Sequence, residues 1–320
     1  MTDRAARPAL WILTSALIFS AMGAFAHALG TRCDWLTVAV VRALFMLVTS
    51  VAVARTTDVP LALWRPRTLW MRSLAGSFSL VCSFYALTHM PIGDVLTLTN
   101  TYPMWILALS WLGLRQVPTP SEVLGVCCGL LGVALIERPH LDAEGDSLAA
   151  VAALLASFST AVAMIGLHRL RTVDARAIVA HFAGVASVVV VTAAIVRSIA
   201  TGGPLLATTD PVTLLLLLGV GLTGTVGQLF LTKAYAAGPP AKLSILGLTQ
   251  VVFGLGLDVL IWRRGLTPTV LAGTVLVLVP AAWLTRRSVG SGPPTPKVPT
   301  PTPNPPQTSR PLATITIETR

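Results

Sequence analysis

The sequence predicts an all-α polytopic membrane protein whose ten transmembrane helices form two inverted five-helix repeats. Three observations lead to this fold class: a low content of charged residues, ten long apolar stretches, and a similarity between the two halves. Of the 320 residues, 54% are hydrophobic and only 11% are charged, whereas soluble domains carry about 25% charged residues. Composition alone therefore places the chain in a lipid bilayer.

The ten apolar stretches are the predicted spans. A helix needs about 20 mostly apolar residues to cross the hydrocarbon layer, and stretches of about this length lie between charged or Gly/Pro-rich breaks. Arg4 and Arg7 precede the first stretch, as in a signal peptide, but it is too long for one and nine more follow. The spans are expected at residues 9–29, 35–54, 74–90, 95–114, 120–136, 147–167, 177–196, 211–231, 243–262 and 268–284.

The net charge of +10 is interpreted as a topology signal and not as a nucleic-acid surface, because Lys and Arg collect in cytoplasmic loops. With the N-terminus inside, the outer segments hold only Arg32, Arg138, Arg197, Arg263 and Arg264. We therefore expect a plasma-membrane or inner-membrane protein with both termini in the cytoplasm. The cytoplasmic segments hold Arg4, Arg7, Arg55, Arg65, Arg67, Arg72, Arg115, Arg169, Arg171, Arg176, Lys233, Lys242, Arg286 and Arg287.

The two halves match without gaps at an offset of 148 residues, and the earlier helices match at an offset of 139. Residues 9–136 and 147–286 are therefore predicted to be two copies of one five-helix unit. The matched pairs are Gly76 with Gly224, Ala86 with Ala234, Pro91 with Pro239, Arg115 with Arg263, Pro120 with Pro268, Gly125 with Gly273, and at 139 Phe19 with Phe158 and Ser20 with Ser159.

Five is an odd number of spans, so the second copy must enter the bilayer from the opposite face. In transporters built from inverted repeats, the substrate site lies near mid-membrane where the repeats meet. A symmetric pair can open to either side at similar energy. The repeat therefore favours transport of a small-molecule substrate over other membrane functions.

Four motifs stand out along the chain: "VRALF" around Arg42, "FYALTHMPIGDVLTLTNTYP" over residues 84–103, "SEVLGVCCGLLGVALI" over residues 121–136 and "KAYAAGPPAKLSILGLTQ" over residues 233–250. Together with the ten spans, they resemble the EamA family of the drug/metabolite transporter superfamily. The resemblance implies a ten-helix secondary carrier with a central cavity lined by helices three, four, eight and nine. It implies no particular substrate. One departure is that Glu122, which the family often has at the fifth helix, matches Val270 in the second copy.

Arg42 is the most unusual residue of the second span, because a charge at the bilayer centre costs about 2.5 to 3.5 kcal/mol on insertion scales. Its counterpart at offset 139 is His181. Two polar residues at equivalent depths suit an anion-binding or gating pair. The alternatives are that Arg42 extends to the headgroups and that His181 only bonds a backbone carbonyl.

The fourth span carries Asn100, Thr101, Tyr102 and Pro103 near its middle. Pro103 removes a helical hydrogen bond and predicts a helix kink, which exposes backbone carbonyls for a substrate. At offset 148, Thr249 and Gln250 match Thr101 and Tyr102. We expect both copies to present polar side chains at this depth, the alternative being a structural kink with bridging side chains.

Four further residues are candidates around the cavity. Tyr85 and Trp105 would give stacking surface and Gln228 an amide donor, although aromatic residues near span ends are often interfacial anchors. Asp258 is the candidate for proton coupling, unless it only pairs with the neighbouring Arg263 and Arg264. Gly125, Gly129 and Gly132 predict close helix contact, either with helix ten or across a homodimer.

The predicted function is a secondary transporter, an exporter of small polar metabolites such as amino acids or related compounds. No G-x-x-x-x-G-K-[ST] loop, H-E-x-x-H motif or pair of intramembrane acids is present, so neither an ATPase nor an enzyme is expected, and no cofactor or metal. The proline-rich residues 290–320 are expected to be a disordered cytoplasmic tail. The alternative function is a receptor or scaffold that acts through this tail.

Overall fold

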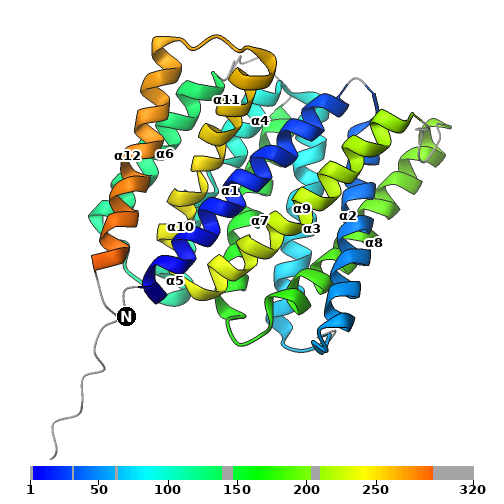
Figure 1. Ribbon diagram of the computed structural model, residues 1–320, viewed down its shortest axis with the longest axis horizontal. Helices are drawn as coiled ribbons and strands as arrows, with labels where there is room; N and C mark the ends of the chain where they lie inside the picture. The colour runs from blue at the N-terminus through cyan, green and yellow to red at the C-terminus, as the bar shows by residue number, and fades with distance from the viewer. Residues whose placement is uncertain (1–2, 31, 62–63, 139–146, 203–209, 291–320) are drawn as a thin grey trace, which may run out of the picture.

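The computed structural model describes residues 3–30, 32–61, 64–138, 147–202 and 210–290, and within these ranges the chain is helical without strands. Twelve helices follow one another along the chain (Figure 1). Their bounds are α1 Asp3–Leu29, α2 Trp35–Thr56, α3 Arg67–His89, α4 Ile92–Thr99, α5 Tyr102–Leu114, α6 Pro120–Glu137, α7 Ser147–Arg169, α8 Ala175–Thr201, α9 Pro211–Ala237, α10 Pro240–Gly247, α11 Thr249–Trp262 and α12 Pro268–Gly290.

Eight runs of the described chain are long and apolar enough to cross a membrane, with α10 and α11 counted as one run. The predicted class of an all-α membrane protein is therefore confirmed. Helix α3 is not among the eight, because it contains Arg67, Arg72 and several serines. The short helices α4 and α5 are also outside this set.

The predicted spans are corrected at three places. Residues 95–114 and 243–262 are not single helices, because each is interrupted, between α4 and α5 and between α10 and α11. The third helix begins at Arg67 and not at residue 74. The prediction began this span after Arg72, since a charge usually bounds a span, but a guanidinium that packs against protein can lie inside one.

The helix bounds of the later part of the chain repeat those of the earlier part. Helices α3 and α9 end at His89 and Ala237, and α4 and α10 end at Thr99 and Gly247, in each case 148 residues apart. Helices α5 and α11 both end in a left-handed residue, Arg115 with φ 54° and Arg263 with φ 57°. The spacing found between matched residues therefore holds for helix ends and caps as well.

Helices from the two parts of the chain pack closely on one another. Helix α1 lies along α9, α3 along α7, α2 beside α8, and α6 beside α12. Figure 1 shows α2 and α8 together at one side of the bundle and α6 and α12 at the other, with α1 and α7 between them. The beginning of α1 and the end of α12 lie at the same end of the molecule (Figure 1).

The glycines of α6 bring this helix against α12 and α10 of the same chain. A Cβ on Gly132 would lie 2.7 Å from the carbonyl oxygen of Gly273, and one on Gly273 would lie 2.7 Å from the carbonyl oxygen of Gly132. Gly129 similarly faces Leu248. The sequence left open whether these glycines contact the tenth predicted span or a second subunit. In the structure Gly132 contacts that span, which is α12.

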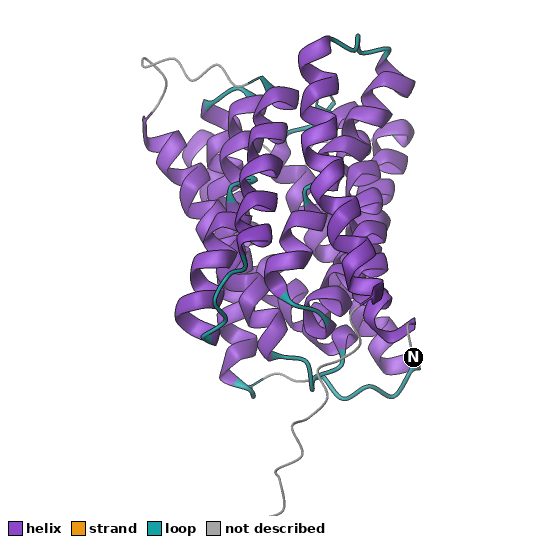
Figure 2. Cartoon of the chain, turned by 90° about the vertical axis from the view of Figure 1, so that its left-hand side faces the viewer, coloured by secondary structure: helices purple, strands orange, loops and turns teal. Residues whose placement is uncertain are grey.

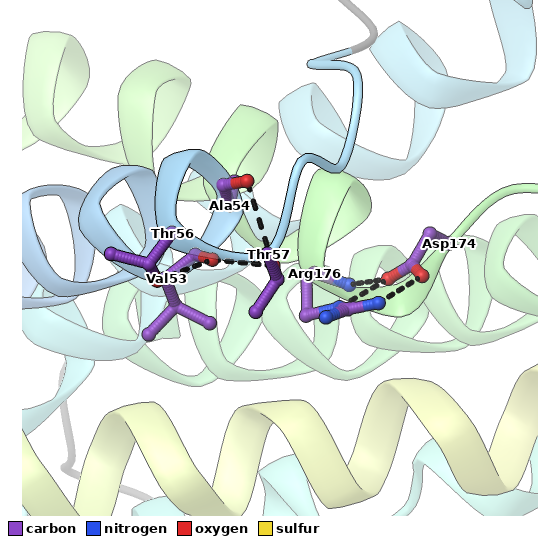
Figure 3. Close-up of polar contacts among 6 residues, drawn as sticks. All are labelled: Val53, Ala54, Thr56, Thr57, Asp174 and Arg176. Carbon is purple, nitrogen blue, oxygen red and sulfur yellow. Dashed lines mark hydrogen bonds and ion pairs between the residues drawn. The ribbon is translucent and has the colours of Figure 1, made fainter.

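The ends of α2 and α8 are capped by side chains (Figure 3). Thr57 donates its hydroxyl to the carbonyl oxygen of Val53, and the Asp174 carboxylate accepts from the backbone N–H of Arg176 at 2.8 Å and from its guanidinium. These hydrogen bonds to Arg176 lower the pKa of Asp174. Asp174 thus satisfies a backbone N–H of the first turn of α8, and the Thr57 hydroxyl adds to the backbone hydrogen bond that Thr57 already makes to Val53. The predicted tail lies outside the described residues from residue 291 on.

Candidate functional site

Two interrupted helices form the centre of the candidate site. Helix α4 ends at Thr99 and α5 begins at Tyr102, with the buried Pro103 in its first turn. Helix α10 ends at Gly247 and α11 begins at Thr249, without a proline. Figure 2 shows short non-helical segments inside the bundle, away from the loops at its two ends. The predicted kink at Pro103 is therefore an interruption of the helix at residues 100–101, and the second copy is interrupted at Leu248, whose backbone stays right-handed helical at φ −62° and ψ −19°.

The first break is held by hydroxyl groups and by its own turn. The Thr101 hydroxyl lies 2.8 Å from that of Ser157 on α7 and 2.6 Å from the carbonyl oxygen of Leu98. The Asn100 side-chain amide donates to the carbonyl oxygen of Leu96 at 2.8 Å. Thr101 thus joins two helices, while the Asn100 nitrogen satisfies its own helix end.

The second break is held in a comparable way by α1. The Ser20 hydroxyl contacts the backbone carbonyl oxygen of Gln250 at 2.7 Å, and the buried Thr249 donates to Leu246 at 2.7 Å. The Gln250 side chain is exposed. A serine from α1 therefore contacts the break in α10–α11, just as a serine from α7 contacts the break in α4–α5.

Tyr102 connects the two interrupted helices. Its hydroxyl donates to the carbonyl oxygen of Ser244 on α10 at 3.4 Å. The fit is close, since a Cβ on Gly247 would lie 2.5 Å from this hydroxyl oxygen. Trp105 packs with Tyr102 against the same buried cluster, which includes Tyr235. Tyr102 and Trp105, which the sequence analysis named as separate candidates, thus pack against one cluster that includes residues of α10.

Arg42 and His181 occupy different interfaces. Arg42 lies against Gly224 of α9, where an added Cβ would be 3.1 Å from its Nε atom, and this Nε has no hydrogen-bond partner among the described residues. His181 is buried and its Nδ1 atom lies 2.8 Å from the Ser73 hydroxyl. Its ring also forms a T-shaped contact with the ring of Trp70, with the two centroids 4.8 Å apart. The neighbours that the structure gives them thus differ, Gly224 of α9 for Arg42 and Ser73 of α3 for His181.

Arg72 is a polar residue that the sequence reasoning missed as a site residue. It was assigned to the cytoplasmic side as a topology charge, but it is only 2% exposed. Its guanidinium lies over the ring of Phe182, 4.1 Å from the centroid. Its position next to Gly76, a member of a matched glycine pair, is the signal that could have indicated burial.

The remaining candidates lie further from the breaks. Gln228 is buried on α9, and its amide nitrogen has no partner within the described part of the chain. Tyr85 stacks on His89 at 4.2 Å near the end of α3. Asp258 forms an ion pair with Arg264 at 3.2 Å. Pairing with a neighbouring arginine is the alternative to proton coupling that the sequence left open for Asp258.

Two hollows in the described structure have apolar linings and contain none of the predicted site residues. The first, of about 370 Å³, lies between α5, α6 and the loop before α6. The second, of about 150 Å³, lies between α3, α5 and α7. Of the candidate residues, His181, Gln228 and Thr249 are buried, whereas the Gln250 side chain is exposed. The second hollow is lined by Met71, Leu109, Gly113, Val162, Ile165 and Arg169.

Comparison with known proteins identifies similar transporters. The model of the EamA-like transporter family matches residues 6–138 and 143–286. The pseudopaline exporter CntI of Pseudomonas aeruginosa (strain UCBPP-PA14) is 28% identical over 231 residues, which cover 69% of this chain and 76% of that protein. An uncharacterized transporter of Helicobacter pylori (strain J99 / ATCC 700824) is 26% identical over 190 residues, 58% of this chain and 62% of the relative.

A solved structure has the same fold. It is described only as "Crystal structure of protein", and it superposes with a TM-score of 0.73 at 17% identity. The match covers 87% of this chain and 98% of the other.

Proposed function

Because the chain belongs to the EamA-like transporter family and is therefore a membrane transporter, we propose that it exports small polar metabolites, such as amino acids or related compounds, by alternating access. The direction follows the similar protein that is named an exporter. The two halves, residues 9–136 and 147–286, are inverted repeats that rock against each other in the plasma or inner membrane. Both termini face the cytoplasm.

One observation carries this proposal: each half contains a helix interrupted inside the bundle, and each break is contacted by the first helix of the other half. Ser157 reaches the break at Thr101, and Ser20 reaches the break at Gln250. In carriers built from inverted repeats, interrupted helices near the midplane provide the substrate site. The two contacts join the same kinds of elements, although Ser20 and Ser157 are not matched positions, and the two separate family-model matches support two repeated units.

The substrate-binding and gating residues proposed here lie around these breaks and along α2, α3, α8 and α9. Arg42 and Gln228 contribute nitrogen donors that have no partner among the described residues. Asp258 is retained as the coupling candidate, since opening of the Arg264 ion pair would free its carboxylate. The complete set is Arg42, Tyr85, Asn100, Thr101, Tyr102, Trp105, His181, Gln228, Thr249 and Gln250.

A metabolite panel tests the proposal in two steps. First, purified protein is screened for thermal stabilisation, because a ligand of the folded state stabilises it by RT ln(1 + [L]/Kd). Flux of each stabilising compound is then measured in reconstituted vesicles. Arg42→Ala and Asn100→Ala should reduce flux at equal amounts of folded protein, whereas Arg32→Ala, which removes an exposed ion pair with Asp210, should not. Unchanged flux for both site variants would refute the proposed site.

The receptor or scaffold alternative requires the proline-rich tail. The similar proteins above are named as transporters, and this gives the alternative no support. Removal of residues 290–320 should leave flux intact if the chain is a carrier. Loss of flux in vesicles with correctly inserted protein would reverse that conclusion.

A further inference from the structure

Arg72 is a buried cation that forms no ion pair with the residues that the structure describes. Its side chain is 2% exposed, and its Nε and Nη1 atoms have no hydrogen-bond partner among the described residues. It lies in α3, which packs along α7 and α8. None of these three helices contains an Asp or a Glu within its bounds. Burial of an unpaired charge is costly, so the free donors require an explanation.

The space around the guanidinium is made by glycines. A Cβ on Gly76 would lie 2.6 Å from the Arg72 Nη1 atom and 2.9 Å from the Phe182 ring. A Cβ on Gly166 would lie 3.1 Å from the Cβ of Arg72. The Phe182 face partly compensates the charge, since cations over aromatic rings are attracted to them. It leaves the in-plane N–H groups of Nε and Nη1 without a partner among the described residues, and each can donate a charge-assisted hydrogen bond to a carboxylate.

Further polar groups lie along the same helix. The Ser73 hydroxyl bonds to His181 of α8 at 2.8 Å, and the buried Ser77 hydroxyl, one turn later, has no partner within the described ranges. Together with Arg72 they form a polar cluster where α3 meets α8 and α7. The cluster lies between the two halves, because α3 comes from the first and α7 and α8 from the second.

A second arginine of the first half packs in a comparable way. Arg42 of α2 packs against Gly224 of α9 with an unpaired Nε atom, and Gly224 lies 148 residues after Gly76. Each glycine of this matched pair therefore accommodates a guanidinium with free donors. Helices α2 and α9 again come from different halves. A movement of the halves would uncover one or the other arginine.

We propose that Arg72 is an anion-binding station on the transport path, and that the substrates are small metabolites with a carboxylate group. This proposal rests on the proposed transport function. In the conformation described here α7 and α8 cover Arg72, and rocking of the halves opens the interface so that the carboxylate accepts a hydrogen bond from Nε or from Nη1. Arg42, at the interface of α2 and α9, is a second such station.

Thermal stability in the presence of matched ligands tests the station. Full-length protein in nanodiscs of neutral phosphatidylcholine, which exclude anionic lipid headgroups, is titrated with succinate and lactate and with their uncharged amides, succinamide and lactamide, at constant ionic strength. At least one carboxylate should raise the Tm in a saturable manner while its amide does not. In Arg72→Gln the affinity should fall about 10- to 100-fold, as expected for loss of hydrogen bonds to a charged group.

Two further variants separate binding from folding. Arg72→Lys keeps the charge and should retain part of the carboxylate shift, whereas Arg32→Gln, far from the cluster in an exposed ion pair, should retain all of it. Without ligand, Arg72→Gln should unfold at a Tm equal to or above that of the wild type, because it removes an unpaired buried charge. A lower Tm in Arg72→Gln with an unchanged carboxylate shift would overturn the proposal, since Arg72 would then be structural.

Two results distinguish this proposal from the transport function itself. In the first, the wild type binds no carboxylate but transports an uncharged metabolite, and Arg72→Gln leaves this flux unchanged. That result would overturn the anion station and leave the transport function intact. Carboxylate binding that depends on Arg72, without flux of any metabolite in the wild type, would support the station and refute the transport function.

Discussion

The contact between Tyr102 and Gly247 gives a precise prediction, because it joins the break of one half to the interrupted helix of the other. A Cβ on Gly247 would lie 2.5 Å from the Tyr102 hydroxyl oxygen, well inside normal contact distance. Gly247→Ala should therefore displace the phenol ring and break its hydrogen bond to Ser244. Insertion of an extra carbon into a packed interface typically costs about 1 to 3 kcal/mol.

The size of the effect can be assigned to the hydroxyl by a double-mutant cycle. Tyr102→Phe removes the atom that the new methyl group would strike, so Gly247→Ala should cost much less in the Tyr102→Phe background. Residues in direct contact show interaction energies of about 0.5 to 3 kcal/mol in such cycles. Gly254→Ala on α11 is the matched control, because no atom lies within 4 Å of its added Cβ. It should be neutral or slightly stabilising, since alanine favours the helix.

The assay is reversible unfolding of the purified protein in mixed detergent, followed by helical circular dichroism, together with flux in vesicles. We expect Gly247→Ala to lower both stability and flux and Tyr102→Phe to restore most of the stability. Equal destabilisation by Gly247→Ala in the two backgrounds would refute the contact as the cause. A wild-type unfolding curve for Gly247→Ala would refute the packing argument itself.

Three further predictions concern helix contacts and caps. Gly132→Ala should destabilise by about 1 to 3 kcal/mol in the same unfolding assay, because its Cβ would lie 2.7 Å from a backbone carbonyl of α12; a neutral effect would contradict the close packing. Ser157→Ala should cost about 0.6 to 1.7 kcal/mol through loss of its bond to Thr101, and an equal loss in a Thr101→Val background would refute this pairing. Hydrogen bonds from Thr213 lower the pKa of Asp210. The stability that Asp210 contributes is therefore fully present above the unfolded pKa of about 3.9 and is lost as pH falls through the lower folded pKa. Asp210→Asn should flatten the acid side of a curve of Tm against pH, and an unchanged curve would exclude the cap.

The sequence by itself determined the membrane class, the approximate helix positions and the spacing between matched residues. These follow from local properties: apolar length sets a span, and a proline or a glycine changes the backbone at its own position. The break at Pro103 could be predicted in this way. The corresponding break at Leu248 could not, because no proline marks it and only the match at offset 148 pointed to polar groups there.

Only the tertiary structure decided which side chains meet. The sequence paired Arg42 with His181 by depth, but their helix faces turn them toward different neighbours, Gly224 and Ser73. It took Arg72 for a topology charge, since a sequence gives the position of a charge along the chain and not what covers it. Burial, the loss of partners and the closeness of Tyr102 to α10 depend on how distant segments pack, and linear spacing does not contain this information.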